Sequence, residues 1–322
     1  MNFHGNNEKI KLSQTDYLIA GSLSGFIARF FVQPLDVVKI RFQLQVEPIS
    51  HGSAKSKYRG FFQAIQSIIK EEGFKAFWKG HFPAQVQAVS FSAFQFTSFE
   101  LISLYSKTLR FNLYGVPIEE SISPVGNFLN GCIAGTVAAV ITQPLDVLRT
   151  RFIAQDNKPI YRNIIQAVRT IRLEEGNKAF FRGLVPSLLL LTPQTGLQFG
   201  LYKLTSNTLN HCSEELLPLS LINMISGGVS GLVAKVAVYP LDIAKKRLQI
   251  QGFEKARQNF GKMHVSSNLL QCLILTCREE GFLGLFKGIQ PSIFKAGISV
   301  SIRFTVFEKI CRILSVTKNP SD

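Results

Sequence analysis

Four isolated cations interrupt stretches that are otherwise apolar in this 322-residue chain: Arg29, Lys235, Lys295 and Arg303. A charged side chain inside a bilayer is costly, and one that is retained there usually lines a pathway for a polar solute. Outside three aspartates in a repeated motif, no carboxylate in these stretches offsets the four cations. A cavity lined by them would attract a multiply charged anion, and a pyrophosphate suits two or three converging cations. The alternative for each cation is snorkelling toward lipid headgroups.

A short charged motif occurs three times, in the pattern Pro-Leu-Asp with Lys or Arg three residues after the Asp. Its prolines are Pro34, Pro144 and Pro240. Its charged members are Asp36 and Lys39, Asp146 and Arg149, and Asp242 and Lys245. Within one helix such an Asp and cation lie about one turn apart and can pair locally, while pairing between helices is the alternative. A proline inside a helix removes a backbone hydrogen bond, so we expect a bend at each proline.

A second motif follows each copy of the first and combines a glutamate-glycine pair with a later aromatic-cation-glycine triplet. The cations and glycines of the triplets are Lys79-Gly80, Arg182-Gly183 and Lys287-Gly288. Each triplet precedes a long apolar stretch, so its glycine should begin a helix whose first N–H groups lack partners. Such N–H groups beside a cation suit a lipid phosphate, and the alternative is a solvated positive face at the membrane surface.

Six stretches with few or no charged residues are long enough to cross a membrane, because a helix needs about 20 residues to span the hydrocarbon. They are 17–35, 80–99, 121–145, 183–202, 216–234 and 288–307. Shorter stretches between them place apolar residues at helical spacing, in 62–69 and 164–171. These shorter stretches are typical of amphipathic helices that lie in the plane of the interface.

The motifs and spans together divide the chain into three tandem repeats of roughly 100 residues, and such self-similarity indicates a repeat architecture. We place the repeats at 16–112, 121–210 and 216–316, between a polar N-terminal tail at 1–15 and a C-terminal tail at 317–322. The predicted fold is an all-α membrane protein, a pseudo-threefold bundle of six transmembrane helices with three short amphipathic helices. Because one chain supplies the whole bundle as one integral domain, we expect a monomer.

The composition argues against several classes of protein. Hydrophobic residues make up 46% and charged residues 18%, yet the formal net charge is +15. A disordered chain would lack the apolar residues, and a soluble nucleic-acid binder would not have the long uncharged runs. The five cysteines form no Cys-x-x-Cys pair, which argues against a disulfide framework or a usual zinc site. The sequence also has no phosphate-binding loop motif, so we expect no enzyme, no catalytic residue, no metal and no cofactor.

The threefold Pro-x-Asp-x-x-Lys/Arg pattern, with its glycine-bearing second motifs, resembles the mitochondrial carrier family over residues 16–316. The resemblance implies three short helices on the matrix side, both termini toward the intermembrane space, and a central site that opens alternately to either side. It also implies a multi-pass location in the inner mitochondrial membrane, with cardiolipin bound at the Lys/Arg-Gly pairs. No nucleic-acid partner is expected.

For the charged motif, the resemblance implies pairs between helices that close the matrix side: Asp36 with Arg149, Asp146 with Lys245, and Asp242 with Lys39. Gln43 and Gln249 resemble braces beneath this ring, whereas the second repeat has Ile153 at that position. The family's charged pattern for the opposite side is incomplete, because Lys203 stands where an acid is expected. We therefore expect a looser gate toward the intermembrane space.

Counted from the triplet glycines, the family's substrate-contact positions on the even-numbered spans fall on Gln87, Leu190 with Leu191, and Lys295. Eight residues beyond Gln87, Leu190 and Lys295 lie Gln95, Gln198 and Arg303. The glutamines can hydrogen-bond a heteroaromatic edge, and the two leucines suit a ring better than a second carboxylate. With Arg29 and Lys235 on the odd-numbered spans, this set favours an organic phosphate over a di- or tricarboxylate.

Segments 39–45, 76–85, 146–152 and 245–257 are most similar to members of the family that carry thiamine pyrophosphate. This similarity implies transport of thiamine pyrophosphate into the matrix, with nucleotides as the counter-substrate. Two alternatives stay open: a carrier of another organic phosphate, such as a nucleotide or coenzyme A, and a non-transporting membrane scaffold of the same fold. A scaffold could lose charges from the predicted ring, whereas all six are present.

Overall fold

The computed structural model describes residues 12–49, 56–114, 123–155, 160–212, 219–253, 266 and 268–318. Most of the two predicted tails, and parts of the links between and within the repeats, lie outside these residues. Every regular element in the described part of the chain is a helix.

Six long helices carry the six predicted spans. They are α1 (Gln14–Leu44), α3 (His81–Tyr114), α4 (Pro124–Ala154), α6 (Leu184–Cys212), α7 (Leu219–Gln249) and α9 (Ile289–Lys318). Each has between 29 and 34 residues and extends beyond the uncharged stretch that predicted it. The difference arises because α1, α4 and α7 continue past their prolines and through the charged motif, which the search for uncharged stretches cut off.

Three of the long helices qualify by length and composition alone as candidate membrane spans. These are α1, α4 and α7, with mean hydropathy of 1.4 to 1.5 over their most apolar windows. Pro34, Pro144 and Pro240 lie inside these helices without ending them. The second, fourth and sixth spans, which are α3, α6 and α9 and which we call the even-numbered spans, have similar lengths. They include more polar side chains, among them the predicted contact glutamines and Lys295.

Local sequence explains where several helices begin. A capping box starts α1, because Asp16 N donates to Ser13 Oγ while Ser13 N donates to the Asp16 carboxylate at 2.9 Å. Ser123 caps α4 with a single bond, because its Oγ accepts from Gly126 N at 3.2 Å, and Pro124 follows in the first turn, where a missing N–H costs nothing.

The short helices are α2 (Phe61–Glu72), α5 (Ile164–Glu174) and α8 (Leu269–Glu280), which confirms the short helix expected in each repeat. A 3₁₀ turn follows each one, at Phe74–Trp78, Asn177–Phe181 and Phe282–Phe286. The glycine between each helix and its turn has a φ of 75° to 77°, a conformation that glycine adopts at little cost. The chain thereby reverses sharply and leads into the next long helix.

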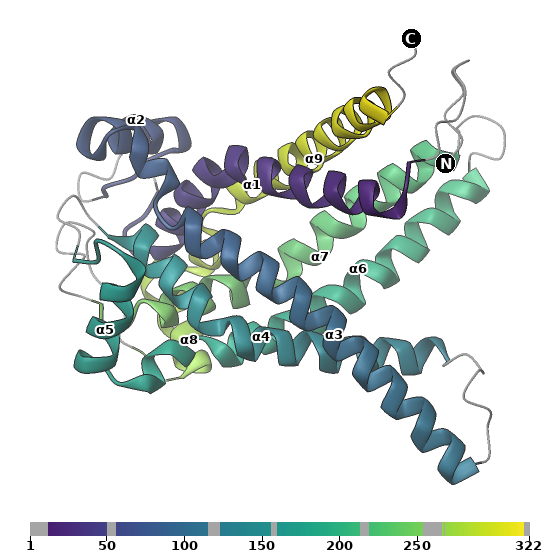
Figure 1. Ribbon diagram of the computed structural model, residues 1–322. Coiled ribbons are helices and arrows are strands. Elements are labelled where there is room, and N and C mark those ends of the chain that lie inside the picture. The colour runs from purple at the N-terminus through teal and green to yellow at the C-terminus, as the bar shows by residue number, and fades with distance from the viewer. Residues whose placement is uncertain are drawn as a thin grey trace.

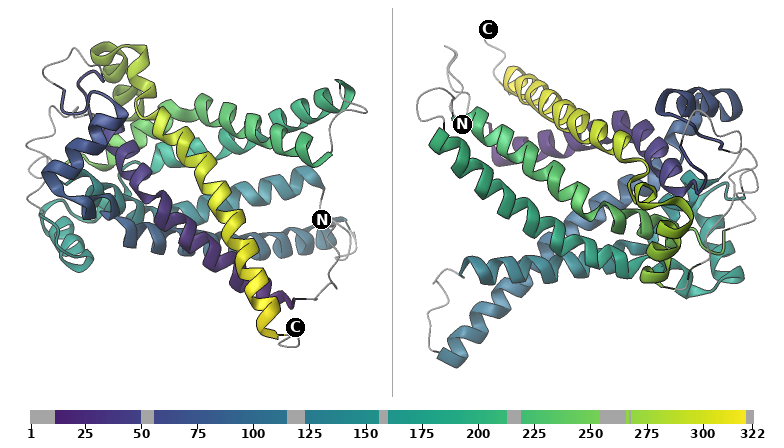
Figure 2. Two further views of the ribbon diagram at one scale, coloured as in Figure 1. Left: turned by 90° about the horizontal axis from the view of Figure 1, so that it is seen from above. Right: turned by 180° about the vertical axis from the view of Figure 1, so that it is seen from behind.

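The long helices converge at one end of the molecule and splay apart at the other (Figure 1). The short helices gather around the converging ends, which we call the narrow end. Helix α1 begins and helix α9 ends at the opposite, wide end. Figure 2 shows that the helices run side by side in the pairs α1 with α9, α3 with α4, and α6 with α7, so each repeat packs mainly against its neighbours.

Buried apolar side chains concentrate at the narrow end. One cluster includes Ile40 of α1 and Ile153 of α4, and a second includes Phe42 and Ile68. Toward the wide end many large apolar side chains are exposed, such as that of Leu101, at 63%. Exposed apolar surface of this extent along long helices suits hydrocarbon rather than water.

Candidate functional site

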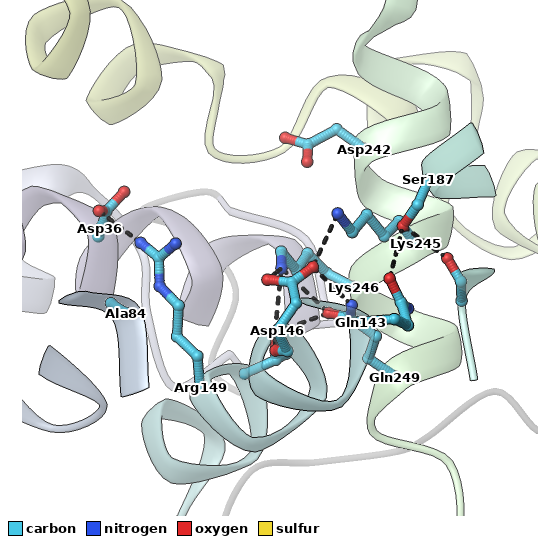
Figure 3. A network of polar contacts seen from close by, with 12 residues as sticks. Asp36, Ala84, Gln143, Asp146, Arg149, Ser187, Asp242, Lys245, Lys246 and Gln249 are labelled. Carbon is cyan, nitrogen blue, oxygen red and sulfur yellow. Dashed lines mark hydrogen bonds and ion pairs between the residues drawn. The ribbon is translucent and has the colours of Figure 1, made fainter. Parts of the chain in front are cut away.

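A ring of ion pairs ties α1, α4 and α7 together at the narrow end. Figure 3 shows the pairs of Asp36 with Arg149 and of Asp146 with Lys245. The pairs are Asp36 with Arg149 at 2.6 Å, Asp146 with Lys245 at 2.7 Å, and Asp242 with Lys39 at 2.6 Å. We call these six residues the ionic ring. Each pair joins two different helices, so in this structure the charged motif pairs between helices rather than locally. Three carboxylates facing three cations leave the ring electrically balanced.

Two of the three corners of the ring carry an additional glutamine. Gln43 Nε2 donates to Asp242 Oδ2 at 3.0 Å, and Gln249 Nε2 donates to Asp146 Oδ2 at 2.8 Å. At the corner of Asp36 and Arg149 the equivalent residue, Ile153, is fully buried and has no polar atom to offer. The structure therefore places the two glutamines where the sequence suggested braces, and it leaves the third corner without one.

Lys246 is a member of this network that the sequence reasoning missed. Its Nζ donates to Asp146 Oδ1, Thr150 Oγ1 and Gln249 Oε1, each at 3.0 Å, and its side chain is 8% exposed. A signal was available, because Lys246 stands where the other two repeats have Ile40 and Thr150. Asp146 is thus held by two lysines.

Lys295 does not stand free in the cavity as its sequence context suggested. Its Nζ lies 2.6 Å from Asp36 Oδ1, so a carboxylate of the ionic ring offsets it. The sequence expectation that the four cations are unpaired is wrong for this one. The error arose because the two residues lie on α9 and α1, which are distant in the sequence and adjacent in the fold.

A second layer of ion pairs lies beyond the ring. Arg41 binds both oxygens of the Glu72 carboxylate, at 2.5 and 2.7 Å, and Lys79 binds the same carboxylate at 2.5 Å. The other repeats repeat this triad, as Arg151, Glu175 and Arg182, and as Arg247, Glu280 and Lys287. Burial raises the pKa of Glu72, but its bonds to Arg41 and Lys79 outweigh burial and hold the pKa below its ordinary value.

The cations of the triplets therefore face inward. Lys287, with 8% of its side chain exposed, also donates to the carbonyls of Val46 at 2.6 Å and Glu47 at 3.0 Å, just past the end of α1. Carbonyls at the end of a helix lack partners within it, and a cation satisfies them well. The lipid role expected of Lys79, Arg182 and Lys287 stays a prediction, and each of these cations is already paired with a glutamate.

The triplet glycines contact the backbone of the ring. Gly80, Gly183 and Gly288 have φ of 74°, 75° and 81°, and a Cβ on them would lie 2.9 Å from the carbonyl oxygens of Arg149, Lys245 and Lys39. Each glycine thus packs against the ring cation of another repeat. This close approach explains why glycine is needed at these three positions, which the sequence did not predict.

The residue before each proline also links the two motifs. Gln33, Gln143 and Tyr239 donate side-chain hydrogen bonds to the carbonyls of Lys79, Arg182 and Lys287, at 3.1, 2.9 and 3.0 Å. The sequence reasoning missed this position, because two glutamines and a tyrosine do not look equivalent. Their shared ability to donate a hydrogen bond is what the structure uses.

Toward the wide end, the predicted cations line two cavities. Lys235, Lys295 and Arg303 line a cavity of about 410 Å³, and Arg29 and Arg303 line another of about 820 Å³. Lys235 Nζ donates to the Ser292 carbonyl at 2.7 Å, and Arg29 Nη1 reaches the equivalent carbonyl of Ala84 at 3.4 Å. The structure brings all four cations to neighbouring cavities that share Arg303.

The other predicted contact residues lie outside the linings of these two cavities. Gln95 lies against Gly135 and Gln198 against Gly231, at the seams between α3 and α4 and between α6 and α7. Gln87, Leu190 and Leu191 are half-buried. Within the described ranges, no cluster of three or more His, Cys, Asp or Glu could hold a metal ion.

The wide end has no counterpart of the ionic ring in the part of the chain that the structure describes. Lys203, which the sequence singled out for this side, and the acidic residues Glu100 and Glu308 of α3 and α9 are exposed and form no ion pair with any described residue. The molecule is therefore closed by ion pairs at the narrow end and open toward the wide end.

Three repeats of two long helices and one short helix, a closed ring of charges and cation-lined cavities define a membrane carrier of the alternating-access class. The chain belongs to the mitochondrial carrier family, because the family model described as "Mitochondrial carrier protein" matches residues 11–108, 120–212 and 219–318. The chain is accordingly a multi-pass protein of the inner mitochondrial membrane.

Curated relatives cover nearly the whole chain. It is 39% identical over 96% of its length to the mitochondrial thiamine pyrophosphate carrier of Macaca fascicularis, covering 93% of that protein. The Homo sapiens protein of the same name is 38% identical over the same shares of both chains. Mitochondrial thiamine pyrophosphate carrier 1 of Coccidioides immitis is 32% identical over 98% of this chain and 97% of its own.

Proposed function

We propose that this chain transports thiamine pyrophosphate across the inner mitochondrial membrane into the matrix, with nucleotides as the counter-substrate. The relatives carry that substrate in their names and match almost the full chain. The observation that carries the proposal is the gathering of Lys235, Lys295 and Arg303 around one cavity. Three cations close together bind a pyrophosphate far better than a neutral or singly charged solute.

The two cavities suit the two parts of this substrate. The pyrophosphate would lie between Lys235, Lys295 and Arg303, while the larger cavity offers apolar side chains such as Leu18 and Phe26 to the rings. Because Arg303 lines both cavities, one molecule can occupy both. Binding at this depth would offset the free energy needed to break the ion pairs of the ionic ring. Such compensation is the condition for a ligand-driven change between two states.

A binding measurement tests the proposal. Thermal unfolding of the purified protein in detergent would be followed with thiamine pyrophosphate, thiamine, inorganic pyrophosphate, ATP, coenzyme A and citrate. We expect thiamine pyrophosphate to raise the unfolding temperature most, because a ligand that binds the native state stabilises it. The Lys235→Met variant should lose more of the shift for thiamine pyrophosphate than for thiamine.

Other outcomes would change the assignment. A larger shift with ATP or coenzyme A would keep the carrier and replace its substrate with another organic phosphate. A shift with citrate alone would contradict the assignment to an organic phosphate and favour a tricarboxylate. No shift with any anion would favour a non-transporting scaffold.

We also propose that lipid phosphate, such as that of cardiolipin, binds where the even-numbered spans begin. A cavity of about 680 Å³ lies beside the first turn of α6 and the start of α8, with Gly183 and Leu269 in its lining. Since Arg182 is paired with Glu175, the backbone N–H groups of these helix starts would supply most of the contacts. We propose further that the protein acts as a monomer, because one chain supplies the whole bundle. The proposal includes no metal, no cofactor and no catalytic residue.

A further inference from the structure

The three corners of the ionic ring are not equivalent. Gly183 lies against the carbonyl of Lys245 and the side chain of Gln249, and Gly80 lies in the same way against the carbonyl of Arg149 and the side chain of Ile153. Ile153 thus occupies the place of a brace without having its amide. The corner between α1 and α4 lacks the bond that the other two corners have.

Asp36 receives its second partner from a different direction. Lys295 reaches it from α9 at 2.6 Å, and the same lysine lines the cavity of about 410 Å³. The Lys295 side chain is 31% exposed, whereas that of Asp36 is only 5% exposed. The second partners at the other two carboxylates come from the ring helices themselves, as Figure 3 shows for Lys246 and Gln249 at Asp146. Only at Asp36, among the ring carboxylates, does a cavity residue complete the corner.

From this asymmetry we infer that Lys295 couples occupancy of the cavity to the ionic ring: an anion that captures Lys295 takes the brace away from Asp36 and loosens the corner between α1 and α4. The inference rests on the proposed function for the nature of the anion. An anion in the cavity competes with Asp36 for one ammonium group, so it binds best to the state in which the corner is released. A ligand shifts an equilibrium by this difference in affinity.

The inference makes Lys295 a positioning residue for the ring, in addition to any contact with the anion. It also gives a reason for Ile153, because a permanent amide brace at this corner would oppose release. The arrangement explains why one corner of an otherwise threefold ring departs from the pattern.

A buried cysteine can report on this corner. Ile40 is 2% exposed and packs in the same apolar cluster as Ile153. The full chain would carry Ile40→Cys with its five native cysteines replaced by serine. In detergent a polar thiol reagent reaches both ends of the protein, so its rate of reaction measures how often the corner opens.

The first comparison uses no anion. Lys295→Met should raise the basal labelling of the reporter by about fivefold or more, the lower range of a coupling between two sites. The matched control is Lys235→Met, because Lys235 lines the same cavity but donates to the Ser292 carbonyl, and within the described residues it pairs with no carboxylate. Equal basal rates in the two variants would overturn the inference, since a lysine that only binds substrate would leave the empty protein unchanged.

The second comparison adds inorganic pyrophosphate. We expect faster labelling in the reporter parent and in Ile153→Leu, and no acceleration in Ile153→Gln, which restores the amide. The pyrophosphate-induced rise in unfolding temperature should be retained in the parent and in Ile153→Leu. It should be smaller but still measurable in Ile153→Gln, because a braced corner disfavours the state that binds the anion best. Acceleration in Ile153→Gln equal to that in the parent would overturn the inference, as would loss of acceleration in Ile153→Leu.

Failure of the proposed function looks different. Pyrophosphate could fail both to bind the parent and to accelerate labelling, while Lys295→Met still raises the basal rate. That result would support Lys295 as a brace of Asp36 and would contradict pyrophosphate as the chemical group that the cavity binds. If pyrophosphate binds and no variant changes the labelling, the result would support the proposed substrate class and would contradict the coupling between the cavity and the ionic ring.

Discussion

Gly288 lies so close to Lys39 that a single added carbon would lie 2.9 Å from the Lys39 carbonyl oxygen. The glycine precedes the last long helix and the lysine belongs to the ionic ring on the first, so this contact joins the first and last long helices. Equivalent contacts at Gly80 and Gly183 tie the other repeats. The narrow end is thus closed by backbone packing as well as by charge.

The first prediction concerns this contact. Gly288→Ala should lower the free energy of unfolding by at least about 1–2 kcal/mol, the cost of placing a Cβ in the left-handed region, and the clash adds to it. Gly25→Ala is the control, because nothing lies within 4 Å of a Cβ there. Thermal unfolding in detergent would compare the two, and equal stability would show that the close approach is unimportant.

The second prediction concerns the pairing between helices. Lys39→Asp and Asp242→Lys should each reduce transport by about tenfold or more, equivalent to roughly 1.4 kcal/mol in the rate-limiting step. The double exchange should recover part of the activity, because the two side chains pair at 2.6 Å across α1 and α7. Absence of any recovery in reconstituted vesicles would argue against this pair as a unit.

The third prediction concerns Lys246. Lys246→Met removes three hydrogen bonds and leaves buried acceptors on Asp146, Thr150 and Gln249, so it should destabilise the protein by about 1–3 kcal/mol. Lys70→Met, at an exposed position on α2, serves as the control. Unfolding curves of the two variants should differ clearly, and overlapping curves would mean that Lys245 alone satisfies Asp146.

The fourth prediction is a pH dependence in the second layer of ion pairs. The folded pKa of Glu72 lies below its ordinary value of 4.5, because Arg41 and Lys79 outweigh burial. Its contribution to stability is therefore complete above about pH 4.5 and is lost as the pH falls through the lower, folded pKa. Glu72→Gln should be less stable than the parent at neutral pH, with the difference shrinking in acid.

The Glu174→Gln variant provides the comparison, since Glu174 is exposed at the end of α5. Its stability should follow that of the parent at every pH. A difference between Glu72→Gln and the parent that stays constant from pH 7 to pH 3 would contradict the assigned pKa shift.

Repetition in the sequence made much of the architecture predictable. A motif that occurs three times allowed each copy to confirm the others. The pairs between helices, the two glutamines and the missing third brace were implied by the resemblance to the mitochondrial carrier family, because the motif alone left local pairing open. The helix lengths were less predictable. Charged residues near the ends of α1, α4 and α7 belong to the helices, although they look like the boundaries of the apolar stretches.

The departures from threefold symmetry were harder to predict. The contact between Lys295 and Asp36 depends on how α9 closes against α1, and no local spacing encodes it. Lys246 could have been noticed as a charge without counterparts, but its three acceptors come from the folded ring. The inward orientation of Lys79 likewise depends on the Glu72 carboxylate that the fold brings beside it.

Transport itself tests the central claim most directly. The purified protein would be reconstituted into liposomes, and uptake of labelled thiamine pyrophosphate would be compared between empty vesicles and vesicles preloaded with thiamine pyrophosphate, ATP or pyrophosphate. We predict saturable uptake that depends on Lys235 and Lys295 and is faster in vesicles preloaded with a nucleotide. Absence of thiamine pyrophosphate uptake, alongside rapid nucleotide exchange by the same vesicles, would contradict the substrate assignment while leaving the carrier intact.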